Sequence, residues 1–132
     1  MPGGREGTTL LPFLVPAVDA DGNERAGVRT AEQAVPVATY TGWNFRSAKI
    51  GGAGRLVGLM GSAVPFAKTA AEKGKMGDVR PSIEERYGSK ERYLGLARSH
   101  SEKLVDGGYL LPGDVAQVMK RMSEQWVLVN GR

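Results

Sequence analysis

The sequence VPAVDADGNERAGVRT, residues 15–30, and its continuation AVPVATYTGWNFR, residues 34–46, determine how the N-terminal half of the chain folds. At its centre, DADGN (residues 19–23) combines side chains that hydrogen-bond to their own backbone with a glycine that tolerates positive φ. This composition predicts a tight turn. The segment before the turn contains two prolines and suits an extended edge strand. We expect residues 26–30 to return as the second arm of a hairpin, and residues 35–40 to form another extended piece.

The acidic turn has some of the oxygen ligands of an EF-hand calcium loop, so its spacing must be checked. Such a loop needs oxygens at positions 1, 3 and 5, glycine at position 6 and glutamate at position 12. Counted from Asp19, the glycine is already at position 4, as Gly22, and position 12 is Thr30. The chain also lacks cysteine and the His/Glu spacing of zinc sites. The sequence therefore predicts a plain turn and no metal site.

Composition and charge narrow the class of protein. The 132 residues suffice for one domain with a core, and the absence of cysteine excludes disulfides and a cysteine nucleophile. The net charge is +4, but the charges are interleaved: residues 1–66 hold six basic and five acidic side chains, and residues 67–132 hold twelve and nine. This pattern is typical of a solvated surface and argues against a nucleic-acid partner.

No apolar run reaches the length of a membrane span, and the N-terminus lacks the features of a signal peptide. We therefore expect a soluble chain without a membrane partner, and the compartment stays open. Glycine is frequent, and Gly52-Ala53-Gly54 begins a dinucleotide-binding fingerprint. The third glycine comes one residue late, at Gly58, and no buried strand precedes it. The sequence predicts a flexible loop there and no cofactor.

The middle of the chain, residues 51–81, is expected to consist of glycine-rich loops and short helical turns. The apolar patches at residues 56–60 and 64–71 suit short, buried helical turns, and residues 73–77 suit an exposed loop. From residue 82 onward the pattern is helical. Ser82 and Glu85 form a capping-box signature.

Two longer helices follow in the C-terminal region. Ser89 is placed to cap a helix over residues 90–106, and Pro112 is suited to the first position of another. Apolar residues recur at helical spacing in both, while residues 127–129 suit a short strand or a docking tail. The two expected faces are Tyr93, Ala97, His100 and Leu104, and Val115, Val118, Met119, Met122 and Trp126.

His100 is the only histidine and thus the only obvious base near neutral pH. Its neighbours Ser99 and Ser101 cannot be its nucleophile, because adjacent helical positions point apart. No G-x-S-x-G nucleophile elbow is present. We therefore assign no catalytic residue, and a structural role for His100 is favoured.

Several blocks in order resemble one protein family. They are the two stretches quoted first, then LVGLMGSAVPFA (residues 56–67), DVRPSIEERY (residues 78–87) and YLLPGDV (residues 109–115). The chain resembles the C-terminal portion of bacterial alpha/beta hydrolase domain-containing proteins. Gly113, where the family leads us to expect an acidic residue, is a departure. The resemblance implies a longer parent with a parallel-sheet catalytic core, whose nucleophile and histidine precede the matched region.

We thus expect an α+β segment that belongs to an α/β-hydrolase-type fold in the parent. A single C-terminal segment, residues 1–132, would comprise an extended or hairpin region (1–50), the glycine-rich middle (51–81) and a helical region (82–132). Short hairpin pieces would come first, and two to three helices last.

The function implied by the resemblance is that of a segment of a carboxylic-ester hydrolase, which packs on the upstream catalytic domain as its partner and borders the substrate site. Trp43, Asn44 and Arg46 are the candidate substrate-binding residues, because an aromatic ring, an amide and a guanidinium can grip a polar ligand. Packing is the competing role for Trp43, since tryptophan most often buries its large surface. The alternatives are a small basic binding module for an anionic partner and a purely structural domain.

Overall fold

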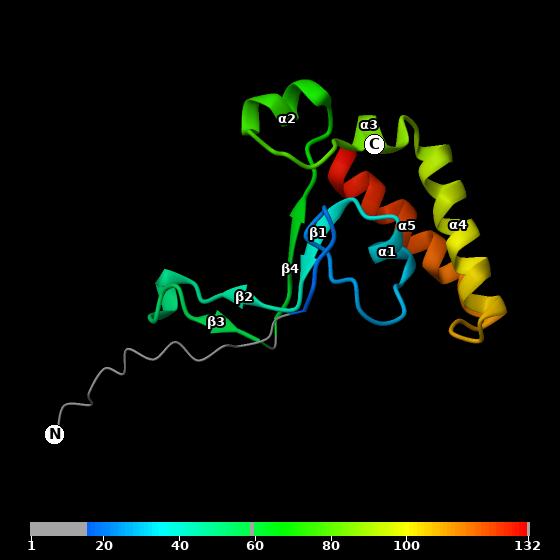
Figure 1. Cartoon of the computed structure of the whole chain (residues 1–132), viewed down its shortest axis with the longest axis horizontal. Helices are drawn as coiled ribbons and strands as arrows, with labels where there is room; N and C mark the ends of the chain where they lie inside the picture. The colour runs from blue at the N-terminus through cyan, green and yellow to red at the C-terminus, as the bar shows by residue number, and fades with distance from the viewer. Residues whose placement is uncertain (1–15, 59, 132) are drawn as a thin grey trace, which may run out of the picture.

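The structure is a computed structural model that describes residues 16–58 and 60–131 (Figure 1). Helices and short antiparallel strands are mixed, so the α+β class is confirmed. The expected strand before residue 16 lies outside the described residues. In chain order the elements are α1 (Ala31–Ala34), β1 (Ala38–Thr41), β2 (Asn44–Phe45), η1 (Ala48–Ile50), β3 (Leu56–Val57), β4 (Ser62–Pro65), α2 (Ala70–Met76), α3 (Ile83–Tyr87), α4 (Lys90–Asp106), η2 (Pro112–Asp114) and α5 (Val115–Asn130).

The N-terminal turn forms as the sequence predicts. The Asp19 carboxylate accepts hydrogen bonds from the backbone amides of Asp21 and Asn23, at 2.9 and 3.0 Å, and Gly22 has a φ of 78°. The hairpin is shorter than expected, because the only bridge joins Val18 to Glu24 and residues 26–30 form no strand in the described part. The fully buried amide of Asn23 instead bonds the backbone of β1.

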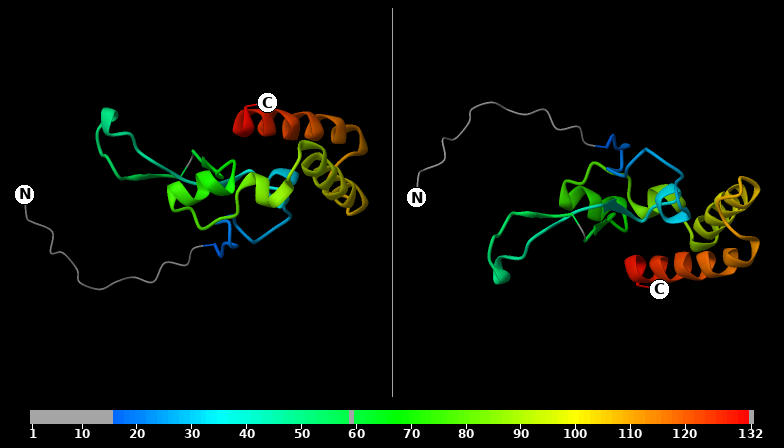
Figure 2. Two further views of the ribbon diagram at one scale, coloured as in Figure 1. Left: turned by 90° about the horizontal axis from the view of Figure 1, so that it is seen from above. Right: turned by 90° about the horizontal axis from the view of Figure 1, so that it is seen from below.

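Two small antiparallel sheets follow, one continuing into the other. β1 pairs with β4, in the register Ala38↔Pro65 to Thr41↔Ser62. Beyond this sheet the same two chain segments pair again as β2 and β3. The result is one long ribbon that runs out from the helices, as Figure 2 shows from above and below.

The middle of the chain differs from the sequence prediction. Residues 56–60 and 64–71 were expected as buried helical turns, but they contain β3 and the end of β4, and Leu56 is 65% exposed. Helix α2 occupies residues 70–76, where an exposed loop was expected in part. The strands form because the ribbon pairs them with β1 and β2, and this long-range pairing overrides the local pattern.

Helix α4 begins and ends where the sequence predicts, and α5 follows the turn η2 that Pro112 opens. The capping box at α3 is present, with the Ser82 hydroxyl accepting from the Glu85 amide at 3.2 Å and the Glu85 carboxylate accepting from the Ser82 amide at 2.6 Å. The Ser89 hydroxyl caps α4 by accepting from the Arg92 amide at 3.2 Å. The expected strand at residues 127–129 is wrong, since these residues continue α5. A helix already stabilised by its packed face extends more readily than it gives way to an unpaired strand.

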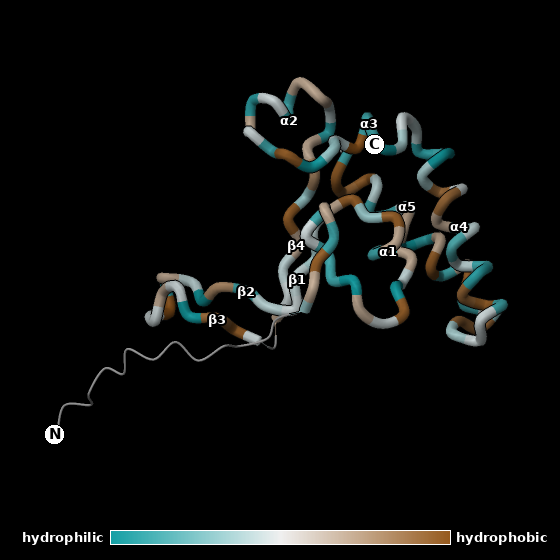
Figure 3. The backbone as a smooth tube through the Cα atoms, viewed as in Figure 1, coloured by the Kyte–Doolittle hydropathy of each residue, from teal (hydrophilic) through white to brown (hydrophobic). Residues whose placement is uncertain are grey.

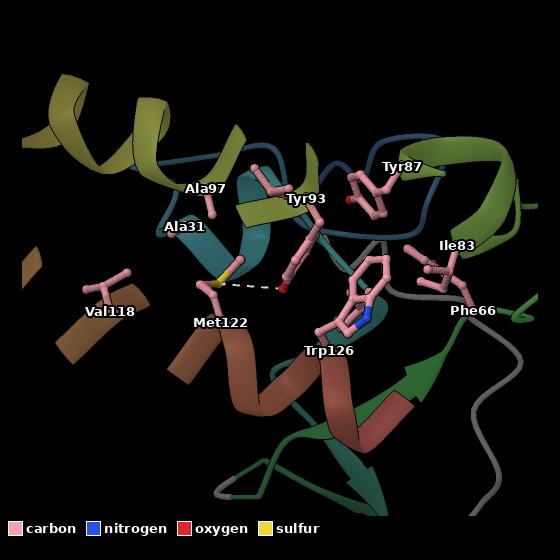
Figure 4. Close-up of a cluster of buried hydrophobic side chains, with 11 residues drawn as sticks. Ala31, Phe66, Ile83, Tyr87, Tyr93, Ala97, Val118, Met122 and Trp126 are labelled. Atoms are coloured by element: carbon pink, nitrogen blue, oxygen red, sulfur yellow. Dashed lines mark hydrogen bonds between the residues drawn. The ribbon is translucent and has the colours of Figure 1, made fainter. Parts of the chain in front are cut away.

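The core lies between α1, α3, α4 and α5 (Figure 4). Tyr93 from α4 and Met122 from α5 are fully buried, and the tyrosine hydroxyl points at the Met122 sulfur, 3.8 Å away. Trp126 packs against Tyr93 and Tyr87, with ring centroids 5.0 and 6.3 Å apart. Burial raises the pKa of Tyr87 and of Tyr93 above the usual range. This aromatic cluster holds the two long helices together.

Arginines tie the sheet and the N-terminal turn to this core. The guanidinium groups of Arg80 and Arg86 both lie over the Phe66 ring, 4.9 and 4.3 Å from its centroid. Arg80 bonds Asp78 and the β1–β4 sheet, and Arg86 forms a two-bond ion pair with Asp21. The Arg80 hydrogen bonds hold the pKa of Asp78 at about 2. Each of these cations is therefore neutralised where it packs.

Candidate functional site

The three residues that the sequence suggested for ligand contact lie on one projecting hairpin. Trp43 precedes β2, Asn44 begins it, and Arg46 follows it. We call residues 43–58 the arm. It extends from the far end of the β1–β4 sheet, away from α4 and α5, and Figure 3 shows hydrophobic stretches along it.

A hollow of about 440 Å³ lies on the arm. Asn44 and Arg46 both line it, so the structure brings these two residues together. The remaining lining is one hydroxyl and four apolar side chains: Ser47, Phe45, Ile50, Val57 and Met60. An apolar wall with a few polar groups is the usual make-up of a small-molecule site.

Trp43 stands beside the hollow rather than in its lining. Its ring packs edge-on against Phe45, with the centroids 5.3 Å apart, and its side chain is 44% exposed. The residue is therefore not part of the buried core. An exposed tryptophan next to a hollow has an apolar face that a ligand or a partner surface can cover.

Local hydrogen bonds shape the tip of the arm. The Ser47 hydroxyl accepts from the Lys49 amide at 3.3 Å and caps the short turn η1. The Arg46 side chain reaches over this turn, with one guanidinium nitrogen 3.4 Å from the Ile50 carbonyl oxygen. A two-stranded hairpin is only marginally stable on its own in water, so a surface that covers the arm would stabilise it.

The arm is also the most one-sided part of the chain in charge. From Gln33 to Ala71 there is no aspartate or glutamate, while four basic residues are present: Arg46, Lys49, Arg55 and Lys68. Their total equals the +4 net charge of the whole chain. The charge counts for residues 1–66 and 67–132 are nearly balanced and do not reveal this acid-free run. A search of the sequence for stretches without aspartate or glutamate would have identified Lys49 and Arg55.

His100 lies in a second hollow, also of about 440 Å³, between α4 and the N-terminal turn. Its Nε2 is 2.9 Å from the Arg29 carbonyl oxygen. Because a carbonyl oxygen only accepts, the ring donates through Nε2, and Nδ1 is the basic nitrogen of the neutral ring. The hydrogen bond ties α4 to the loop before α1.

The acidic groups near His100 are already paired. Asp19 forms an ion pair with Arg29 at 2.8 Å, and Asp21 pairs with Arg86. Burial opposes ionisation of Asp19, but hydrogen bonds from Asn23 and Arg29 outweigh it and lower the pKa of its carboxyl. In the part of the chain that the structure describes, no hydroxyl group is hydrogen-bonded to His100. The geometry there is that of a structural histidine.

Within residues 16–58 and 60–131, no group of three or more histidine, aspartate or glutamate side chains could hold a metal ion. The helices in those same ranges are too short or too polar to cross a membrane. The arm and its hollow are therefore the candidate functional site among the described residues, and their side chains are of types that suit binding better than proton transfer.

Comparison with known proteins supplies the family. The family model described as alpha/beta hydrolase domain matches residues 3–120. No curated protein and no solved structure matches the chain. The matched residues include the arm, both N-terminal stretches and α4. The chain therefore belongs to the alpha/beta hydrolase domain family.

Proposed function

We propose that this chain forms the C-terminal segment of a carboxylic-ester hydrolase, packs on the catalytic domain and borders its substrate site through the arm. The partner would be the upstream catalytic domain, which supplies the nucleophile and its base. The chain itself supplies binding surface, with Trp43, Asn44 and Arg46 as the contact residues.

The observation that carries the proposal is the exposure of the apolar residues of the arm. Phe45 and Ile50 are 60% and 66% exposed, and Leu56 is similar, although each is large enough to belong to a core. Exposed apolar patches of this kind on folded proteins usually mark an interaction surface. An arm that reaches away from its own helices is well placed to lie against another domain.

The chemistry of the described residues also favours a non-catalytic role. Hydrolysis of an ester requires a nucleophile within hydrogen-bond reach of a base that a third group orients. His100 is engaged with a backbone carbonyl, and both nearby carboxylates are held by arginines. A catalytic partner is the simplest source of the missing groups.

The test is a reconstitution assay. A longer member of the family, from which the segment equivalent to this chain has been deleted, is mixed with the purified chain, and hydrolysis of p-nitrophenyl butyrate is measured. We expect the chain alone and its His100→Ala variant to show only background hydrolysis, and the mixture to regain activity. Failure of the chain to bind the truncated enzyme or to raise its activity would overturn the proposal.

Variants locate the effect on the arm. Trp43→Ala, Asn44→Ala and Arg46→Ala should each restore less activity than the unmodified chain, at unchanged stability of the isolated chain. Arg92→Ala is the matched control, because Arg92 is exposed on α4, far along the chain from the arm. If the three arm variants restore full activity, the arm does not border the substrate site.

The binding-module function remains the second candidate, and the acid-free run from residue 33 to residue 71 favours it. It predicts that the chain binds an anionic column more tightly than a protein of equal net charge, with steep dependence on salt. In that case reconstitution should fail while arm variants weaken the retention.

A further inference from the structure

The arm places two arginines directly opposite each other. The β2–β3 register pairs Asn44 with Val57 and Phe45 with Leu56, so the next pair is Arg46 and Arg55. The Arg46 amide donates to the Arg55 carbonyl oxygen at 2.8 Å, which confirms the continuation of the ladder. Like charges at directly opposite positions destabilise a hairpin.

The two side chains also run along the same side of the tip. A Cβ atom placed on Gly52 would lie 3.5 Å from the Cδ atoms of both Arg46 and Arg55. Glycine at this position, with a φ of 66°, lets both stems approach the backbone closely. The tip therefore gathers two guanidinium groups, and Lys49 adds a third cation on η1.

No acidic group compensates this charge in the described part of the chain. In the rest of the described chain, residues 16–42 and 60–131, which we call the body, Arg29, Arg80 and Arg86 each pair with an aspartate. Among residues 16–58 and 60–131, by contrast, no carboxylate forms an ion pair with a cation of the arm. We take a pair of opposed like charges without an acidic partner as the mark of a site for an anionic ligand, because charge-assisted hydrogen bonds to an anion would offset the repulsion.

The arginine pair calls for a negative charge on the ligand, and the neighbouring hollow indicates a second property, an apolar part. Arg46 belongs both to the arginine pair and to the lining of the hollow, where Ile50 and Val57 supply apolar surface. The guanidinium thus stands at the border between a cationic tip and an apolar wall. A molecule with an anionic head and an apolar body matches both parts.

We infer that the arm binds amphipathic anions, and that the ester substrates of the hydrolase carry a carboxylate or phosphate group on an apolar body. The head would lie between Arg46 and Arg55, and the apolar part along Ile50 and Val57. The substrate class rests on the proposed function, whereas the anion site is a property of this chain alone.

The anion site is tested by nuclear magnetic resonance on the complete nitrogen-15-labelled chain. Octyl phosphate and octanoate are titrated separately, with octyl glucoside as the neutral probe of equal chain length and inorganic phosphate as the head alone. We expect the octyl anions to shift amide signals of residues 44–58 at lower concentration than either control, and the two octyl anions to show which head is preferred. Equal binding of octyl glucoside, or shifts confined to the helices, would overturn the inference.

Three variants sharpen the result. Arg46→Gln and Arg55→Gln should each weaken the affinity for the preferred octyl anion by about tenfold, because each removes a charge-assisted hydrogen bond. Arg92→Gln changes the net charge equally on the exposed face of α4 and should leave the affinity within about twofold. If Arg92→Gln weakens binding as much as the arm variants do, the attraction is non-specific and the site does not exist.

The reconstitution assay separates this inference from the proposed function. Binding of the octyl anion at the arm without restored hydrolysis would keep the anion site and overturn the hydrolase function. Restored hydrolysis of neutral esters, with no anion binding and no effect of Arg55→Gln, would keep the function and overturn this inference. Restored hydrolysis that favours an anionic ester, and loses that preference with Arg55→Gln, supports both.

Discussion

The body buries a cluster of large apolar side chains, whereas the arm exposes most of its own. In the body, Tyr93, Met122 and Trp126 are at most 8% exposed and contact one another. In the arm, Phe45 and Leu56 are exposed by more than half and meet few neighbours. These apolar residues of the body are thus accounted for by its own packing, whereas those of the arm stay exposed, which is the observation behind the proposed interaction surface.

The two regions also differ in whether their arginines have acidic partners. Three arginines of the body, Arg29, Arg80 and Arg86, bond aspartates, and Arg80 and Arg86 additionally lie over the ring of Phe66. Arginines of the arm face each other without an acidic partner in the described part of the chain. Residues that stabilise a fold and residues that serve a ligand often differ in this way, because a binding site must leave some groups unsatisfied until the ligand arrives.

Truncating one large side chain in each region should give the largest contrast. Trp126→Ala removes the centre of the aromatic cluster and should lower the free energy of unfolding by about 3–5 kcal/mol. Phe45→Ala removes an exposed ring and should change it by less than about 0.5 kcal/mol. Urea unfolding followed by far-ultraviolet circular dichroism measures both.

If Trp126→Ala does not fold at all, Trp126→Phe leaves a smaller cavity and keeps the comparison measurable. A cost for Phe45→Ala as large as that for Trp126→Phe would contradict the division into body and arm. It would mean that the arm packs on the body in solution and is part of the same core.

The ion pair of Asp78 with Arg80 makes a pH-dependent contribution to the body that the arm lacks. Hydrogen bonds from Arg80 lower the pKa of Asp78 from 3.8 to about 2. A carboxyl whose pKa is lower in the folded state stabilises the fold above its unfolded pKa, and this stabilisation is lost as the pH falls from about 4 to 2. Asp78→Asn should therefore be less stable than the unmodified chain at pH 7. The stabilities of the two proteins should converge as the pH approaches about 2.

Thermal melts of the unmodified chain and of Asp78→Asn between pH 7 and pH 2 provide the measurement. The relevant quantity is the difference between their melting temperatures as a function of pH. Other acids, such as Glu85, whose pKa is lowered by its hydrogen bonds to Ser82, cancel in that difference. A constant offset across the whole range would show that Asp78 contributes packing or neutral hydrogen bonds rather than an ion pair.

Local signals in the sequence predicted the C-terminal region well. The capping box at Ser82 and the periodic face from Tyr93 to Leu104 depend on residues three and four apart, and such patterns survive in almost any tertiary context. The turn around Gly22 was predictable for the same reason. Helix α4 formed where these signals placed it, whereas α5 continued beyond the predicted helical face, through residues 127–129.

The ribbon could not be predicted in this way. The partner of β4 is β1, more than twenty residues earlier in the chain, and no short-range signal marks this pairing. Residues 56–60 were expected to be buried because apolar runs usually are, but the register places Leu56 on a projecting ribbon, where its side chain is 65% exposed. Asn44 and Arg46 could be suggested from residue type alone. The acid-free run of the sequence could have indicated Arg55 as a basic residue, but only the register shows that it lies opposite Arg46.

The smallest expected effect tests whether the arginine pair serves the fold or a ligand. Arg55→Gln removes one of two like charges at opposite positions and should stabilise the arm by roughly 0.2–1 kcal/mol. The Arg46 amide, which donates to the residue 55 carbonyl oxygen, should then exchange its hydrogen more slowly in a ligand-free sample at low salt. Added salt should reduce the difference, because it screens exposed charges. Arg92→Gln should leave this amide unchanged. Faster exchange in Arg55→Gln would show that the two guanidinium groups support the tip of the arm, and their pairing would then need no ligand to explain it.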